Sequence, residues 1–248
     1  MLIAVLTAPV GVSGAVFLLP VQLSLLNVPS PAITPTNLLY NVVATPGALA
    51  RYRADGRLFG PLTRLLICGT LPGVVAGAAV RVFAVPGTGV FRVLVALLLL
   101  PLGVWLCART LRPPRRPSPA EPSRRFTVLL ALAVGVAGGV YGIGGGSLLG
   151  PILAGRGMPV ARVAPAALAA TFVTSVAGAA AYALLSLTGA GGGPGQVAPD
   201  WRLGLMCGLI GGYLGARLQP RLPETALRLL LGGLATALAL LYFAQSLT

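Results

Sequence analysis

Long runs without charge dominate the pattern of polar and apolar positions in this chain. No charged residue occurs from Met1 to Ala50, from Phe126 to Gly155, or from Val163 to Pro199. About 20 helical residues cross the hydrocarbon core of a bilayer, so uncharged apolar runs of about 18 or more residues predict membrane-spanning helices. The pattern therefore predicts an all-α, polytopic membrane protein. About eight segments are expected, at 2–24, 33–50, 62–80, 90–109, 126–154, 162–186, 201–219 and 225–246.

A weak internal repeat divides the eight segments into two halves. A shift of 131 residues places Gly11 on Gly142 and Pro20 on Pro151, and the order of further matches is kept along the chain. The repeat predicts a duplicated protein with two homologous four-segment halves, each with a glycine-broken helix. The expected domains are a first repeat at 1–111, a Pro- and Arg-rich linker at 112–125 and a second repeat at 126–248. The linker cannot be helical, because proline removes backbone donors and clashes with the preceding turn.

The net charge and the low content of charged residues bear on which partners the protein has. The chain has a net charge of +14 but only 9% charged residues, where a soluble domain usually has about a quarter. A basic soluble protein would suggest nucleic acid as partner. Here the arginines cluster beside apolar runs, which indicates membrane topology and contact with membrane lipids, and no nucleic-acid partner.

The arginines also predict an orientation. Arg51, Arg53 and Arg57 and the linker arginines fall on one side if every segment crosses the membrane once. The positive-inside rule makes that side cytoplasmic, so we expect a multi-pass protein of the cytoplasmic membrane with both termini in the cytoplasm. The same count places three later arginines on the opposite side: Arg217, Arg221 and Arg228.

The residue types available exclude most catalytic chemistry. The chain has no histidine, its three cysteines form no CxxC pair, and its four acids stand at segment ends or in the linker. Acid–base catalysis, covalent catalysis and metal binding all need clusters of such groups. The sequence therefore predicts a protein that is not an enzyme and that has no cofactor and no metal site.

One glycine cluster interrupts the fifth segment, which is longer than a single straight span needs. It consists of Gly142, Gly144, Gly145 and Gly146, followed by Ser147. A broken helix at membrane depth survives only where it faces protein or a watery cavity, and the free N–H groups of the following half-helix favour anions. Glycine-interrupted segments at matching positions of two halves are typical of transporter sites. The alternative is close helix packing through small residues.

Two polar groups lie in the matching segments two and six. Asn37 and Asn41 are four residues apart and share one helical face. Buried amides need a partner, either a neighbouring helix or a ligand. Thr171, Thr174 and Ser175 are candidates to line the same site, although hydroxyls often bond to the backbone of their own helix. By contrast, the Gly69-xxx-Gly73-xxx-Gly77 face is expected to serve packing.

These features together resemble the TauE/SafE family, whose members are grouped as exporters of sulfite and organosulfur compounds. The resemblance rests on the glycine motif followed by Pro151, the Asn-bearing segment, the Asp200-Trp201-Arg202 start of segment seven and the Gly77-Ala78 and Gly215-Ala216 pairs. It covers nearly the whole chain and implies transport of small, usually sulfur-containing, anions. It also implies a site made by the glycine motif with Ser147, Asn37 and Asn41. The first-half motif departs from the pattern, so the second half carries more weight.

The sequence thus predicts a secondary transporter that moves a small anionic substrate by alternating access. Two alternatives are a passive anion channel and a non-transporting membrane scaffold. Nothing in the sequence identifies the anion, the direction of transport, the coupling ion or whether the chain forms a homo-oligomer.

Overall fold

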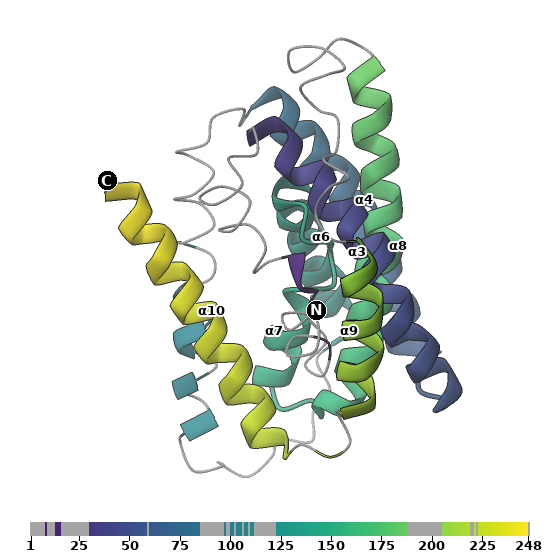
Figure 1. The fold of residues 1–248 in the computed structure, drawn as a ribbon, viewed down its shortest axis with the longest axis vertical. Coiled ribbons are helices and arrows are strands. Elements are labelled where there is room, and N and C mark those ends of the chain that lie inside the picture. Colours follow the sequence, from purple (N-terminus) through teal and green to yellow (C-terminus); the bar gives the residue numbers. More distant parts are fainter. Residues whose placement is uncertain are drawn as a thin grey trace.

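The computed structural model describes residue 8, residues 13–15, 30–58 and 60–84, scattered positions between 97 and 111, and residues 123–187, 205–218, 221 and 223–247. Within these residues the fold is all-helical (Figure 1), as predicted. The helices are α3 (Ser30–Ala54), α4 (Pro61–Phe83), α6 (Arg124–Tyr141), α7 (Leu149–Gly155), α8 (Val160–Leu187), α9 (Leu205–Leu218) and α10 (Glu224–Leu247).

Three helices of the described part are long and apolar enough to cross a membrane, namely α4, α6 and α8. They correspond to the predicted segments three, five and six. The predicted segments one and four and the linker lie mostly outside the described residues. The eight-segment, two-half architecture therefore stays a prediction, as does the domain division.

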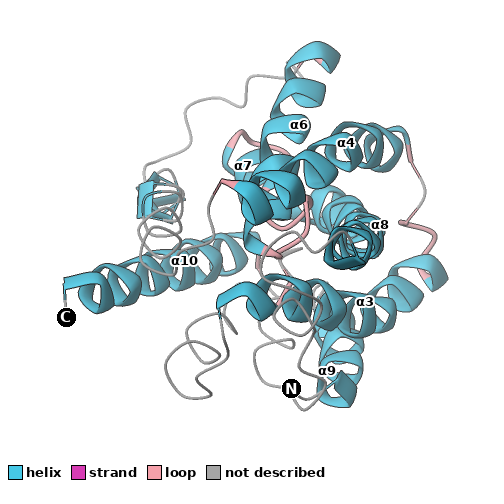
Figure 2. Cartoon of the chain, turned by 90° about the horizontal axis from the view of Figure 1, so that it is seen from above, coloured by secondary structure: helices cyan, strands magenta, loops and turns pink. Residues whose placement is uncertain are grey.

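The helices form a packed group in which α8 lies between α4 and α3, and α9 packs on the far side of α3 (Figure 2). In the predicted repeat, α3 corresponds to α8 and α4 corresponds to α9. The contact of α3 with α9 then corresponds to the contact of α8 with α4. Each of these contacts joins one helix of the first predicted half to one helix of the second. This pairing is the one expected of a duplicated chain whose halves pack around a shared axis.

Small residues set the distance between α4 and α6. A Cβ atom on Gly73 would overlap the carbonyl oxygen of Leu132, and one on Gly77 would overlap that of Val136. The backbones of the two helices therefore touch, which is how glycine stripes pack helices in membranes. The packing role predicted for this glycine face is confirmed. Because successive contacts advance in the same direction along both helices, α4 and α6 run parallel.

The fifth predicted segment is a hairpin and does not cross the bundle as one span. Helix α6 ends at Tyr141, and α7 leads back toward the end at which α6 began. The Arg156 guanidinium, just after α7, lies 3.9 Å from the centre of the Phe126 ring in the first turn of α6. Helix α8 begins at this same end, because Arg57 donates a hydrogen bond to the Ala161 carbonyl over 2.9 Å. The chain reverses because the glycines at the turn allow backbone angles that other residues rarely adopt.

The hairpin changes the number of crossings on which the predicted orientation depended. Ala216, near the end of α9, packs in one cluster with Tyr52 and Leu58, so the adjacent Arg217 lies at the same end as Arg57. Its predicted place on the opposite side is wrong, because the count took segment five as one crossing. We call this end of the bundle the arginine end. It gathers the following side chains: Arg51, Arg53, Arg57, Arg64, Arg124, Arg156, Arg162 and Arg217. The orientation of the termini stays a prediction.

The hairpin topology predicts which positions share one side of the membrane. Single cysteines in place of Arg125 and Arg217 should react with a membrane-impermeant maleimide from the same side. A cysteine in place of Leu187, at the far end of α8 and 78% exposed, should react from the other side. The background is a variant with Cys68, Cys107 and Cys207 replaced by alanine, and intact spheroplasts are compared with inverted vesicles. Labelling of positions 125 and 217 from opposite sides would contradict the hairpin and support a fifth segment that crosses the membrane once.

Candidate functional site

The turn between α6 and α7, residues 142–148, lies midway along the bundle. The Gly145 N–H donates to Thr174 Oγ1 over 2.9 Å, and Asn41 Nδ2 donates to the Gly142 carbonyl over 3.4 Å. A Cβ atom on Gly145 would come within 2.6 Å of Thr70 Cβ. Thr70, Thr174 and Asn41 each stand near the middle of α4, α8 and α3. Transporters of several folds place their substrate sites at this depth, beside broken helices.

Two residues of the turn require glycine for conformational reasons. Gly142 ends α6 with φ 72°, and Gly144 has φ 74°, both in the left-handed region. Residues with a Cβ rarely adopt such angles. The predicted break in the fifth segment is thus confirmed, and α7 begins at Leu149, two residues after Ser147.

Buried hydroxyl groups surround the turn on the side of the first-half motif. Ser147 Oγ lies 2.6 Å from the Ile143 carbonyl oxygen, 3.0 Å from Ser13 Oγ and 3.3 Å from Thr171 Oγ1. Ser13 is 4% exposed, while Ser147 and Thr171 are 1% and 0% exposed. Ser13 belongs to the weakened first-half copy of the glycine motif, so the two copies touch. Sequence reasoning placed Ser13 in that copy but did not select it as a site residue.

Helix α8 supplies the remaining predicted hydroxyls. Thr174 Oγ1 donates to its own helix at the Ala170 carbonyl over 2.6 Å, and it accepts the Gly145 N–H. Ser175 Oγ accepts from Asn41 Nδ2 over 3.2 Å. The glycine motif, the Asn41 amide and the α8 hydroxyls therefore meet at one place, whereas Asn37 makes no hydrogen bond there among the described residues.

The glycines also pack closely. A Cβ atom on Gly146 would overlap the Ala167 carbonyl oxygen on α8, and one on Gly142 would overlap the Thr34 carbonyl oxygen on α3. The two explanations offered for the cluster are thus compatible, because the close approach brings the α8 hydroxyls to the turn. The N–H of Gly145 already bonds to Thr174, so this group is not exposed for a ligand in this conformation.

Asn37 is the least satisfied polar side chain of the region. It is 0% exposed, and neither its Oδ1 nor its Nδ2 has a hydrogen-bond partner among the described residues. Asn41, one turn further along α3, is equally buried, yet only its Oδ1 is unpartnered. An unpaired buried amide costs about 1–3 kcal/mol per polar group, so proteins rarely retain one without a reason.

A buried arginine, missed in the sequence, stands beyond this region. Arg81, in the last turn of α4, is 4% exposed and lies close enough to Tyr182 for the two to interact electrostatically. Tyr182 packs with Leu38, the neighbour of Asn37 in sequence, and donates to the Gly139 carbonyl over 3.0 Å. In the sequence, Arg81 comes one residue after the predicted 62–80 segment. Because it was placed outside the segment, it was not considered as a site residue. Ionisable groups buried in membrane helices are commonly functional.

Comparison with known proteins identifies the family of this chain. The family described as "Sulfite exporter TauE/SafE" matches residues 1–242 of the 248 in the chain. No curated protein and no solved structure matches the chain. The family match covers both predicted halves, and the spanning-length apolar helices agree with a membrane protein. The chain belongs to the TauE/SafE family of sulfite exporters.

Proposed function

We propose that this protein is a secondary transporter that moves a small sulfur-containing oxyanion across the cytoplasmic membrane. The observation that carries the proposal is the Asn37 amide, fully buried beside the mid-depth turn and without a hydrogen-bond partner among the described residues. Family membership supports the class of substrate. We propose no catalytic role, because transport needs no bond to be broken.

The proposed site binds the anion through uncharged donors. Asn37 Nδ2 offers two N–H donors, and the hydroxyls of Ser147, Thr171 and Ser175 can rotate to donate to anionic oxygens. Hydrogen bonds to a charged group are roughly twice as strong as neutral ones, so a few such donors suffice for specific binding. Because none of them carries a full charge, the anion can also leave, as conduction and transport require.

Arg81 supplies the positive charge that the donors lack. It is buried on α4, near Tyr182, which packs against Leu38 of α3. In a medium of low dielectric constant a guanidinium attracts an anion over a longer range than it does in water. We propose that Arg81 favours anions over neutral solutes at the site without contacting the substrate directly.

The contact between the two motif copies is the proposed moving part. Ser13 bonds to Ser147 and to the Ile143 carbonyl, so it links the predicted halves beside the site. Alternating access requires one half to move against the other around a fixed site. In this proposal, the Ser13–Ser147 contact breaks and re-forms during each cycle.

Flux measurements in proteoliposomes test the proposal against its alternatives. Sulfite, thiosulfate and methanesulfonate are offered outside vesicles that contain the full chain, with chloride as the comparison anion. We expect saturable uptake of a sulfur oxyanion and accelerated exchange when the same anion is inside. Flux without saturation or exchange would support a passive channel, and absence of flux for every oxyanion would support a scaffold.

Ser147→Ala should weaken transport more than it weakens the fold. The change removes the hydroxyl shared by Ser13, Thr171 and the Ile143 carbonyl, so we expect about a tenfold loss of transport efficiency, equivalent to one hydrogen bond to an anion. The control is Ser186→Ala, whose hydroxyl, among the described residues, bonds to the Ala183 carbonyl of its own helix. Equal transport by the two variants would remove Ser147 from the site. Initial rates at several substrate concentrations provide the measurement.

A further inference from the structure

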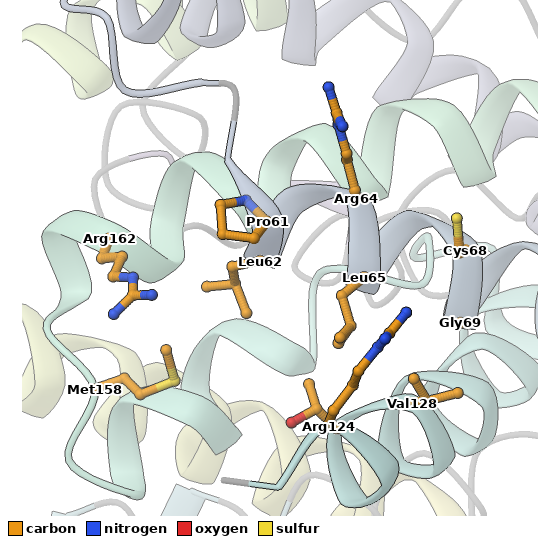
Figure 3. Close-up of a pocket in the computed structure, with 11 residues that line it drawn as sticks. Pro61, Leu62, Arg64, Leu65, Cys68, Gly69, Arg124, Val128, Met158 and Arg162 are labelled. Atoms are coloured by element: carbon orange, nitrogen blue, oxygen red, sulfur yellow. The ribbon is translucent and has the colours of Figure 1, made fainter. Parts of the chain in front are cut away.

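A pocket at the arginine end lies where the three spanning-length helices begin. Its cavity measures about 660 Å³ and opens among the first turns of α4, α6 and α8 (Figure 3). It lies apart from the mid-depth turn and has no residue in common with the proposed substrate site. The lining residues are Pro61, Leu62, Arg64, Leu65, Cys68, Gly69, Arg124, Thr127, Val128, Met158 and Arg162.

The lining combines basic and apolar groups. Each of the three helices contributes one exposed arginine, namely Arg64, Arg124 and Arg162. Of the described residues that line the pocket, none is acidic. Apolar side chains such as Leu62 and Leu65 lie between the arginines, and the three guanidinium groups stand apart from one another (Figure 3).

The position of the pocket places these groups at the surface of the membrane. The candidate spans α4, α6 and α8 begin at Pro61, Arg124 and Val160, so helices of this length and composition would enter the hydrocarbon at this end. The pocket therefore has charged groups at the level of lipid headgroups. Its apolar side chains include Val128, which is 38% exposed and lies one turn further along α6 than Arg124.

We propose that this pocket binds an anionic phospholipid. The spread of the three arginines suits the phosphate and polar oxygens of a headgroup better than a single small anion, which would need them to converge. Leu65, Val128 and Met158 would contact the glycerol and the upper acyl chains. Basic pockets between membrane helices bind anionic headgroups in this way. A bound lipid would join the starts of α4, α6 and α8 on one side of the bundle.

Two triple variants of the full chain test the proposal. The pocket variant replaces the lining arginines: Arg64→Gln, Arg124→Gln and Arg162→Gln. The control variant replaces exposed arginines at the same end that do not line the pocket: Arg53→Gln, Arg125→Gln and Arg217→Gln. Both lose the same total charge, so they differ in position alone.

Binding is measured by native mass spectrometry of delipidated protein titrated with phosphatidylglycerol, cardiolipin or phosphatidylcholine. We expect the Kd for the anionic lipids to rise about tenfold or more in the pocket variant and less than about twofold in the control. Phosphatidylcholine should bind weakly throughout, and millimolar inorganic phosphate should not displace the lipid. If the pocket variant does not fold, Arg64→Gln and Arg124→Gln are measured singly, each with about a threefold rise expected.

Two outcomes would overturn the proposal. An equal loss of lipid binding in both triple variants would mean that diffuse surface charge, and not the pocket, attracts the lipid. Displacement by inorganic phosphate at matched concentration would assign the pocket to a soluble anion.

Discussion

Replacing Asn37 with leucine should strongly reduce saturable anion transport while leaving the empty protein at least as stable as the unmodified one. The two polar atoms of Asn37 are buried without partners among the described residues, so their removal relieves a cost of about 1–3 kcal/mol for each atom. Leucine has a similar branched outline and fits an apolar environment. If Nδ2 donates two hydrogen bonds to the substrate, their loss should lower transport efficiency about a hundredfold.

The matched control is Asn41→Leu on the same face of α3. Asn41 bonds to the Gly142 carbonyl and to Ser175, so its replacement should lower the unfolding temperature as well as transport. Thermal unfolding in detergent and flux in proteoliposomes are measured for both variants, with and without sulfite. The stabilisation that sulfite gives the unmodified protein should disappear in Asn37→Leu. If Asn37→Leu is as destabilised as Asn41→Leu and still transports, Asn37 has a structural role and the proposed site is wrong.

Gly146→Ala should cause the largest loss of stability among the glycine substitutions of the turn. The added Cβ atom would overlap the Ala167 carbonyl oxygen, which belongs to the backbone of α8 and cannot rotate away. Overpacking of a rigid contact costs about 1–3 kcal/mol, which corresponds to a fall of about 2–12 °C in Tm for a chain of this size. The displaced turn should also separate Ser147 from Thr171 and so reduce transport.

Gly233→Ala provides the control for this effect. Gly233 lies on α10, and no described residue beyond its own helix turn places an atom within 4 Å of the position of its Cβ, so alanine should be neutral or stabilising by up to about 1 kcal/mol. The two variants are compared by thermal unfolding and by recovery of monodisperse protein after membrane extraction. Equal Tm values would show that the turn relaxes away from α8 at little cost, which would contradict the close packing described here.

Properties that depend on neighbouring positions in the chain could be predicted from the sequence. The apolar runs indicated a helical membrane protein, because the cost of placing charge in hydrocarbon adds up residue by residue. The break at Gly142–Gly146 followed from the conformational freedom of glycine. The repeat and its motifs also suggested the family that the chain is now shown to belong to.

The return of the chain after that break could not be predicted in the same way. The glycines permit a bend but do not fix its direction, which depends on distant contacts such as that of Arg156 with Phe126. The end of the bundle at which Arg217 lies depends on that direction, so it could not be predicted either. The burial of Arg81 likewise depends on packing around α4 and not on its place at the end of an apolar run.

The sequence alone determined that this is a membrane protein, that it is helical, and which residue types are available for a site. The tertiary structure decided which of those residues meet, because contacts between helices depend on packing geometry that no single segment encodes. Asn37 and Asn41 show the difference: they share a residue type, a helix and a face, yet only Asn41 reaches Gly142 and Ser175. Likewise, three arginines scattered along the chain line one pocket because their helices begin side by side.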